Sequence, residues 1–209
     1  MEFKLRLSIA LGAAKGLAHL HSQSPRLIHK DFKTANVLVD ENFIAKVADS
    51  GLGNFLVGID VGPSSRAASD EIFLSPEVRE FRSFSERSDV YSFGVFLLEL
   101  LCGREASGCS SLATEQTVVE TVQCVEDYRS LAGMLDKKLG SSFTAEGMEE
   151  FVKLIMRCVE ISSERRPSMN DVVVELDRIL EKERTLTTVM GEEGTPTVTL
   201  GSQLFEASK

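Results

Sequence analysis

Apolar residues in the first twenty positions recur at the spacing of an amphipathic helix. They fall three or four positions apart and form one stripe, made by Leu5, Ile9, Ala13, Leu17 and Leu20. Basic residues near the start and the short apolar run at 7–14 also resemble a signal peptide. Because a continuous stripe has to pack against something, we favour a core helix over a targeting segment.

Two short segments after Ser24-Pro25 are typical of β-strands. Residues 36–39 read Asn-Val-Leu-Val, residues 44–48 read Ile-Ala-Lys-Val-Ala, and turn-forming residues at 40–42 separate them, which predicts a small hairpin. The next stretch, 49–77, has no hydrophobic period and is rich in Gly, Ser, Pro and Asp. We expect a long loop there, and long loops in compact domains are usually functional or disordered.

The second half of the chain predicts helices. Residues 88–101 are apolar on nearly every side, which indicates a helix buried on most of its surface, and Cys102-Gly103 is a normal helix end. Residues 114–128 predict a weaker helix. Clear apolar faces predict two further helices, over 148–159 and 169–180.

The last predicted helix has a start signal, and the chain beyond it does not favour structure. Ser168 and Asp171 are spaced as a capping pair. From Thr185 onward Thr, Gly, Glu and Ser dominate, so residues 184–209 are expected to form a flexible tail. The predicted fold class is therefore mainly α with a small β hairpin.

Composition narrows the class of protein. The 209 residues are 43% hydrophobic, enough to bury a core, and carry 23 basic against 32 acidic side chains, a net charge of −9. An acidic protein lacks the basic surface that general nucleic-acid binding requires. The 4 cysteines form no C-x-x-C pair and the 3 histidines all precede residue 30, so we expect reduced thiols and no zinc cluster. No uncharged apolar run approaches the roughly 18–20 residues of a membrane span.

Chemically capable side chains flank the predicted hairpin. Asp31, Lys33 and Asn36 precede its first strand, and Asp49 follows its second. Transfer of a γ-phosphoryl group requires a carboxylate to accept the hydroxyl proton, a cation near the moving phosphate, and oxygen ligands for Mg²⁺. These four residues match those requirements in order.

Several motifs together resemble the C-terminal lobe of a eukaryotic protein kinase. Residues 29–36 read H-K-D-F-K-T-A-N where the family has H-R-D-L-K-x-x-N, and residues 49–51 read D-S-G where it has D-F-G. Residues 75–77 read S-P-E for A-P-E, and residues 88–94 read S-D-V-Y-S-F-G, as in the family's long buried helix. The sequence is most similar to plant receptor-like Ser/Thr kinases. The resemblance implies a kinase C-lobe over 1–183, with a catalytic loop at 27–39 and an activation segment at 49–77.

The resemblance also assigns roles to individual residues. Asp31 would be the catalytic base and Lys33 would neutralise the transferring phosphate. Asn36 and Asp49 would ligate Mg²⁺, and Leu38 would pack under the adenine of ATP. A lysine on an arbitrary loop is usually a solvated surface residue, but its spacing from Asp31 favours the functional role.

Other matching residues would be structural. Asp89 would lie below the catalytic loop and hold its backbone near His29, and His29 is expected to be a packed structural histidine rather than an acid or base. Arg166, in E-R-R-P-S-M, would pair with Glu77 of the S-P-E motif.

The sequence departs from the family pattern within the same motifs. Lys30 replaces an arginine and cannot grip a phosphate bidentately, and Ser50 replaces the phenylalanine of D-F-G. In an ungapped alignment, Asp70 falls on the usual threonine and Ile72 on a usual glycine. Candidate phosphorylation sites lie in the same loop, although serines there are more often simply solvated: Ser64, Ser65 and Ser69.

The Gly-rich phosphate loop and the strand lysine of a kinase, G-x-G-x-x-G and V-A-I-K, occur nowhere in the chain; Gly51-Leu-Gly53 lacks the third glycine. In the family these parts form an N-lobe upstream of the first helix, so the chain alone is expected to be nearly inactive. Two hypotheses follow: a Ser/Thr kinase homologue that needs an N-lobe, or a pseudokinase-like binding module or scaffold acting through the C-lobe surface. A helical domain unrelated to phosphoryl transfer is the least favoured alternative.

The kinase resemblance implies ATP and Mg²⁺ as cofactors and a protein substrate or partner kinase, with association through the exposed roof of the lobe. It implies a cytoplasmic location, including the cytoplasmic face of the plasma membrane through a partner. Nucleic acid is not an expected partner.

Overall fold

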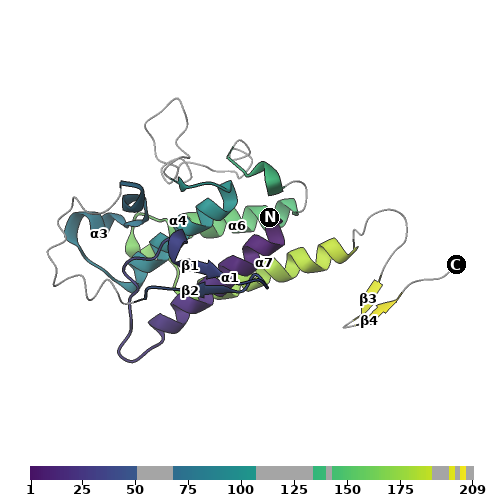
Figure 1. The fold of residues 1–209 in the computed structure, drawn as a ribbon, viewed down its shortest axis with the longest axis horizontal. Helices are drawn as coiled ribbons and strands as arrows, with labels where there is room; N and C mark the ends of the chain where they lie inside the picture. The colour runs from purple at the N-terminus through teal and green to yellow at the C-terminus, as the bar shows by residue number, and fades with distance from the viewer. Residues whose placement is uncertain (51–67, 107–133, 140–142, 190–197, 201–202, 206–209) are drawn as a thin grey trace.

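The computed structural model describes residues 1–50, 68–106, 134–139, 143–189, 198–200 and 203–205. Its long helices are α1 (Phe3–His21), α4 (Glu86–Cys102), α6 (Ala145–Cys158) and α7 (Met169–Val189), and α3 (Pro76–Phe81) is a short one. Figure 1 shows the long helices side by side, with the small hairpin of β1 (Val37–Val39) and β2 (Ala45–Val47) lying across α1. The predicted fold class, mainly helical with one small hairpin, is confirmed.

The core lies between the helices, where α1 packs on α7 and α4 packs on α6. α4 is buried on almost every side, including Phe93, Phe96 and Leu97, as its all-round hydrophobicity predicted. A capping box of Ser85 and Ser88 begins this helix two residues before the predicted start, and Gly103, at φ 66°, ends it.

The hairpin pairs antiparallel, with Val37 opposite Val47 and Val39 opposite Ala45. It approaches α1 closely because Gly16 has no side chain: a Cβ there would lie 2.7 Å from Cγ2 of Val47. α1 thus holds the hairpin, and with it the two loops at its ends.

Short 3₁₀ turns complete the described chain: η1 (Thr34–Asn36), η3 (Ala68–Phe73), η6 (Lys137–Leu139) and η7 (Ser163–Arg165). The buried Arg6 of α1 fixes η6, since its guanidinium donates to Leu100 O and to the carboxylate of Asp136. That hydrogen bond lowers the pKa of Asp136.

Two sequence predictions concern the segment 114–128 and the C-terminal residues 184–209. The predicted helix over 114–128 lies outside the described residues. At the C-terminus, α7 continues past 183 to Val189, and β3 (Val198–Leu200) pairs with β4 (Gln203–Phe205). The flexible tail over 184–209 stays a prediction. No described helix is long and apolar enough to cross a membrane.

The crossing of α4 and α6 gives the first test of this packing. A Cβ on Gly94 would lie 2.7 Å from Cγ1 of Val159 and 2.8 Å from Cβ of Cys158. We therefore expect Gly94→Ala to lower the free energy of unfolding by about 1–3 kcal/mol, despite the better helix propensity of alanine, because the core would be overpacked. Urea denaturation measures the change.

The matched control is Val174→Ala on the exposed face of α7, where the side chain is 67% exposed and a change within about 0.5 kcal/mol is expected. A Gly94→Ala protein as stable as the control would contradict the close crossing.

Candidate active site

Asp89, one turn into α4, holds the loop that carries the candidate catalytic residues. Its carboxylate accepts hydrogen bonds from the backbone amides of His29 at 2.7 Å and Lys30 at 3.0 Å, and lies 2.9 Å from Nε2 of His21. Asp89 is only 1% exposed. Lys30 has a left-handed backbone at φ 69°, a conformation uncommon for lysine. The buried carboxylate therefore fixes a turn that the local sequence does not favour.

His29 lies in the core beneath this loop. Its ring is fully buried, Nε2 lies 3.0 Å from Ala48 O, and its edge meets the ring of Phe32. Phe32 in turn contacts Phe93 and Phe96 of α4. The ring is therefore shielded from solvent, and its role as a structural histidine stays a prediction.

The four candidate chemical residues meet at one end of the hairpin. Nζ of Lys33 lies 3.6 Å from Oδ2 of Asp31. Asn36 donates from Nδ2 to Asp31 O at 2.7 Å. The backbone carbonyl of Asn36 accepts from the amide of Ala48, the residue before Asp49, at 2.8 Å. These bonds bring the loop before β1 and the loop after β2 together.

The donor set fits a divalent cation shared with a nucleotide. Nδ2 of Asn36 donates to Asp31 O, which leaves Oδ1 of Asn36 as an oxygen ligand. Asp49, whose backbone has a φ of 59°, adds an exposed carboxylate. Mg²⁺ typically takes one or two protein oxygens and completes its shell with phosphate and water. Within the described ranges no cluster of three His, Cys, Asp or Glu forms a self-sufficient metal site.

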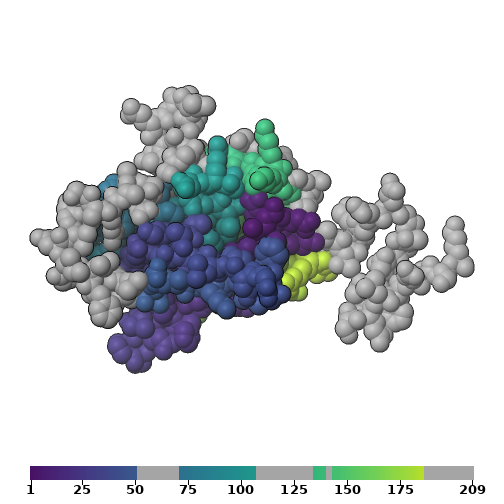
Figure 2. Space-filling model, viewed as in Figure 1, coloured from purple at the N-terminus to yellow at the C-terminus, as the bar shows by residue number. Residues whose placement is uncertain are grey.

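The hairpin and its connecting turn carry four exposed apolar side chains. Leu38 is 57% exposed, Val39 43%, Phe43 47% and Ile44 55%. The hairpin lies on the face turned toward the viewer in Figure 2. Exposed clusters of large apolar side chains usually mark a surface that another part or partner covers.

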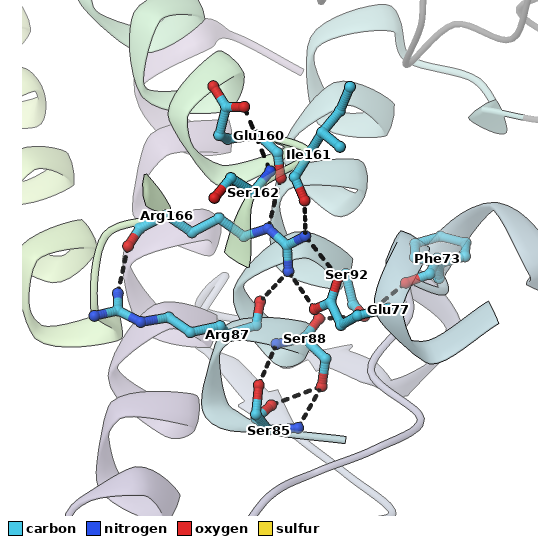
Figure 3. A network of polar contacts seen from close by, with 10 residues as sticks. All are labelled: Phe73, Glu77, Ser85, Arg87, Ser88, Ser92, Glu160, Ile161, Ser162 and Arg166. Atoms are coloured by element: carbon cyan, nitrogen blue, oxygen red, sulfur yellow. Dashed lines mark hydrogen bonds and ion pairs between the residues drawn. The ribbon is translucent and has the colours of Figure 1, made fainter. Parts of the chain in front are cut away.

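A buried ion pair joins α3 to the turn before α7. Both terminal nitrogens of Arg166 donate to the carboxylate of Glu77, at 2.6 and 2.9 Å, and the same guanidinium donates to the carbonyls of Arg87, Glu160 and Ile161 (Figure 3). Tyr91 lies under the guanidinium plane at 5.1 Å. Burial is the largest single effect and disfavours the charged Glu77, but hydrogen bonds, the strongest of them from Arg166, and the positive charge of Arg166 together lower the pKa of Glu77.

Comparison with known proteins decides the family. A family model described as protein tyrosine and serine/threonine kinase matches residues 1–176. The chain belongs to the protein kinase family. It is 39% identical over 186 residues to the probable serine/threonine-protein kinase PBL28 of Arabidopsis thaliana, covering 86% of this chain and 50% of that protein. It is 36% identical over 187 residues to receptor-like cytoplasmic kinase 176 of Oryza sativa subsp. japonica, covering 88% and 47%.

A solved structure supports the same assignment. The pseudokinase domain of BIR2, described as an immune regulator of the RLK/Pelle family, matches with a TM-score of 0.71 at 30% identity, over 88% of this chain and 54% of that chain. The chain spans about half the length of PBL28 and 36% of the proline-rich receptor-like protein kinase PERK3 of Arabidopsis thaliana.

The sequence did not mark His21, at the end of α1, by any spacing or motif. In the structure His21 contacts Asp89, which also accepts the backbone amides of His29 and Lys30. Of the predicted activation-segment residues, Ser64 and Ser65 lie outside the described residues, as do the side chains of Ser69 and Asp70. Ile72 is partly buried against the core, and Ser50 is exposed.

Removing the charge of Glu77 tests the buried ion pair. Glu77→Gln would leave the Arg166 guanidinium buried without its counter-ion, so we expect a loss of about 3–5 kcal/mol of unfolding free energy at pH 7. A carboxyl with a lowered folded-state pKa stabilises the protein above its unfolded value of about 4.5 and loses that contribution as pH falls through the folded value. The difference between wild type and Glu77→Gln should therefore shrink below about pH 4.5.

The pH series is measured by urea denaturation, with Glu149→Gln as control because Glu149 pairs with the exposed Lys153. A Glu77→Gln difference that is constant down to the acid transition would show that the charge of Glu77 is not what stabilises the link.

Proposed function

We propose that this chain carries the catalytic-loop half of a Ser/Thr protein kinase site and belongs to a protein that transfers a phosphoryl group from ATP to Ser/Thr hydroxyls of a protein. The observation that carries the proposal is the convergence of Asp31, Lys33, Asn36 and Asp49, through the Asn36–Asp31 and Ala48–Asn36 hydrogen bonds. The membership of the kinase family supports it.

Each residue has a distinct role in the proposed transfer. Asp31 accepts the proton of the substrate hydroxyl, because its side chain is partly open to solvent and its backbone is fixed by Asn36. Lys33, 3.6 Å from Asp31, neutralises charge on the transferred group. Asn36 and Asp49 supply oxygen ligands for Mg²⁺, and Leu38 provides an apolar contact for the adenine. Bound Mg-ATP supplies the phosphoryl group and the metal charge.

The 209 residues themselves provide only part of the required positioning. They contain no Gly-rich loop and no V-A-I-K lysine, the parts that hold the phosphates of ATP in kinases. Losing about 4 kcal/mol of positioning energy slows chemistry roughly 1000-fold. We therefore propose that this chain alone transfers phosphate negligibly and that an N-lobe is needed.

A binding module is the second candidate. The structural match to the pseudokinase domain of BIR2 favours it, as do the replacement of the D-F-G phenylalanine by Ser50 and the presence of Asp70 where the ungapped alignment has the usual threonine. In this case the exposed hairpin surface would engage a kinase or its substrate without transfer. For either candidate we propose a cytoplasmic location, including the cytoplasmic face of the plasma membrane through a partner.

A kinase assay separates the two candidates. The 209-residue chain with Mg-ATP is expected to show no thermal shift and no phosphorylation of a generic Ser/Thr peptide above an Asp31→Asn control. A chimera with the N-lobe of an active plant relative placed before Met1 is expected to phosphorylate the peptide, and Asp31→Asn should abolish this.

A folded chimera without transfer would favour the binding module. Turnover by the 209-residue chain that disappears in Asp31→Asn would contradict the need for an N-lobe.

The apolar hairpin face predicts dye binding by this chain. We expect 1-anilinonaphthalene-8-sulfonate fluorescence to rise with the folded chain and to fall severalfold in a Phe43→Asn, Ile44→Thr double variant, since this removes large apolar groups from an exposed cluster. Asparagine suits position 43 because Phe43 has φ 60°.

The matched control is Val174→Thr, which removes a single exposed apolar side chain on α7. Equal dye binding by wild type and the double variant would show that the hairpin face is not an accessible apolar surface.

A further inference from the structure

A cavity of about 350 Å³ lies beside His21 and the first turn of α4. Its walls come from the end of α1, the loop after it, and the first turns of α4 and α7. This volume is at the lower end of the range of small-molecule sites. None of the proposed catalytic residues lines it.

The walls of the cavity carry groups that bind anions. Arg26 and Arg87 are among the lining residues, as is Ser168, whose hydroxyl already donates to Oδ2 of Asp171. Arg87 donates through one terminal nitrogen to Arg166 O. Guanidinium groups offer several N–H donors in a planar fork that suits phosphate oxygens.

Two helix N-termini also open on the same space. The first amides of a helix have no partner within it, and the caps of these two helices bind the third amide: Ser85 Oγ accepts from Ser88 N, and Ser168 Oγ accepts from Asp171 N. The first two residues of each helix line the cavity: Glu86, Arg87, Met169 and Asn170. Helix N-terminal amides together with arginines form an electropositive setting.

One lining residue opposes an anion. Glu86 pairs with Arg26 at 3.0 Å, and the Arg26 side chain is 73% exposed. An exposed pair of this kind contributes little free energy, so an arriving anion can take Arg26 as its own partner. Glu86 then gives a test of opposite sign to that of Arg26.

We propose that this cavity is a binding site for a phosphate dianion, and that its occupancy is transmitted to the catalytic loop. The path runs through His21, which lines the cavity and lies 2.9 Å from Oδ2 of Asp89. The same oxygen accepts the backbone amide of His29, while Oδ1 accepts that of Lys30. The dianion comes either from a phosphorylated side chain or from a free phosphate. Binding at this cavity does not depend on the proposed phosphoryl transfer, since its ligand is bound without being chemically changed.

Calorimetric titration at constant ionic strength tests the binding. The probes are inorganic phosphate and N-acetyl-O-phosphoserine amide, with N-acetylserine amide as the uncharged comparison. We expect both phosphates to bind and the comparison not to bind. Tighter binding of the phosphoserine derivative would assign the site to a phosphorylated side chain, and tighter binding of inorganic phosphate to a free ligand. Absence of binding by both probes at millimolar concentration would overturn the proposal.

Charge variants locate the site. Arg26→Gln should weaken phosphate about tenfold, as expected for the loss of a hydrogen bond to a charged group, whereas Glu86→Gln should strengthen it severalfold. Lys153→Gln removes an equally exposed cation that is paired with Glu149 on α6 and should change nothing. The side chains of Arg26, Glu86 and Lys153 are at least partly exposed, so the three variants are expected to fold. Thermal unfolding checks this. Equal affinities of Arg26→Gln and Glu86→Gln would exclude this cavity as the site.

Backbone NMR tests the link to the loop. The amide resonances of His29 and Lys30 are expected to shift with added phosphate and to saturate at the same dissociation constant as the calorimetric binding, while the Val174 amide stays in place. Saturable binding without a shift at His29 and Lys30 would overturn the transmission through Asp89.

Discussion

The buried carboxylate of Asp89 is the interaction on which the arrangement of this lobe depends. It accepts hydrogen bonds from the amides of His29 and Lys30. These bonds offset the left-handed backbone of Lys30, a conformation that costs about 1–3 kcal/mol. Hydrogen bonds to a charged acceptor contribute about 1.5–3 kcal/mol each. The position of Asp89 is in turn set by the Ser85–Ser88 capping box. The start of α4 therefore determines where Asp31 lies.

A second buried charge fixes the other edge of the same helix start. The Arg166 side chain is fully buried. Each of its guanidinium nitrogens donates to an acceptor, either the Glu77 carboxylate or a backbone carbonyl. A buried pair of this kind contributes modest net stability but is costly to break. Arg87, next to Ser88, exchanges hydrogen bonds with Arg166 in both directions. The two buried charges are thus joined by the first turn of α4, and the catalytic loop and α3 take their positions from one short segment.

Periodicity and motif order predicted much of this structure. The stripe on α1, the all-round apolar α4 and the Ser168–Asp171 cap all formed where the pattern placed them. The pattern did not predict that His21 meets Asp89 across 68 positions, because no local rule and no motif encodes this contact. Backbone strain was hidden as well, because Lys30 and Phe43 are not residues that signal a positive φ. The closeness of the hairpin to α1 depends on Gly16, which in a helical pattern reads only as a weak helix former.

Charge explains why the site must rely on oriented groups rather than on the field of the whole protein. Between residues 25 and 49 the basic and acidic side chains balance, and the chain as a whole is acidic, so a phosphate gains little from long-range attraction. Short-range donors have to supply the affinity, and they work only when held in place. Asp89 is where this holding is concentrated, and its Oδ2 serves both His21 and the amide of His29. A carboxylate that binds both a residue of the cavity wall and the catalytic loop cannot strengthen one hydrogen bond without changing the other. The contacts of Asp89 with His21 and with the His29 amide are therefore energetically coupled.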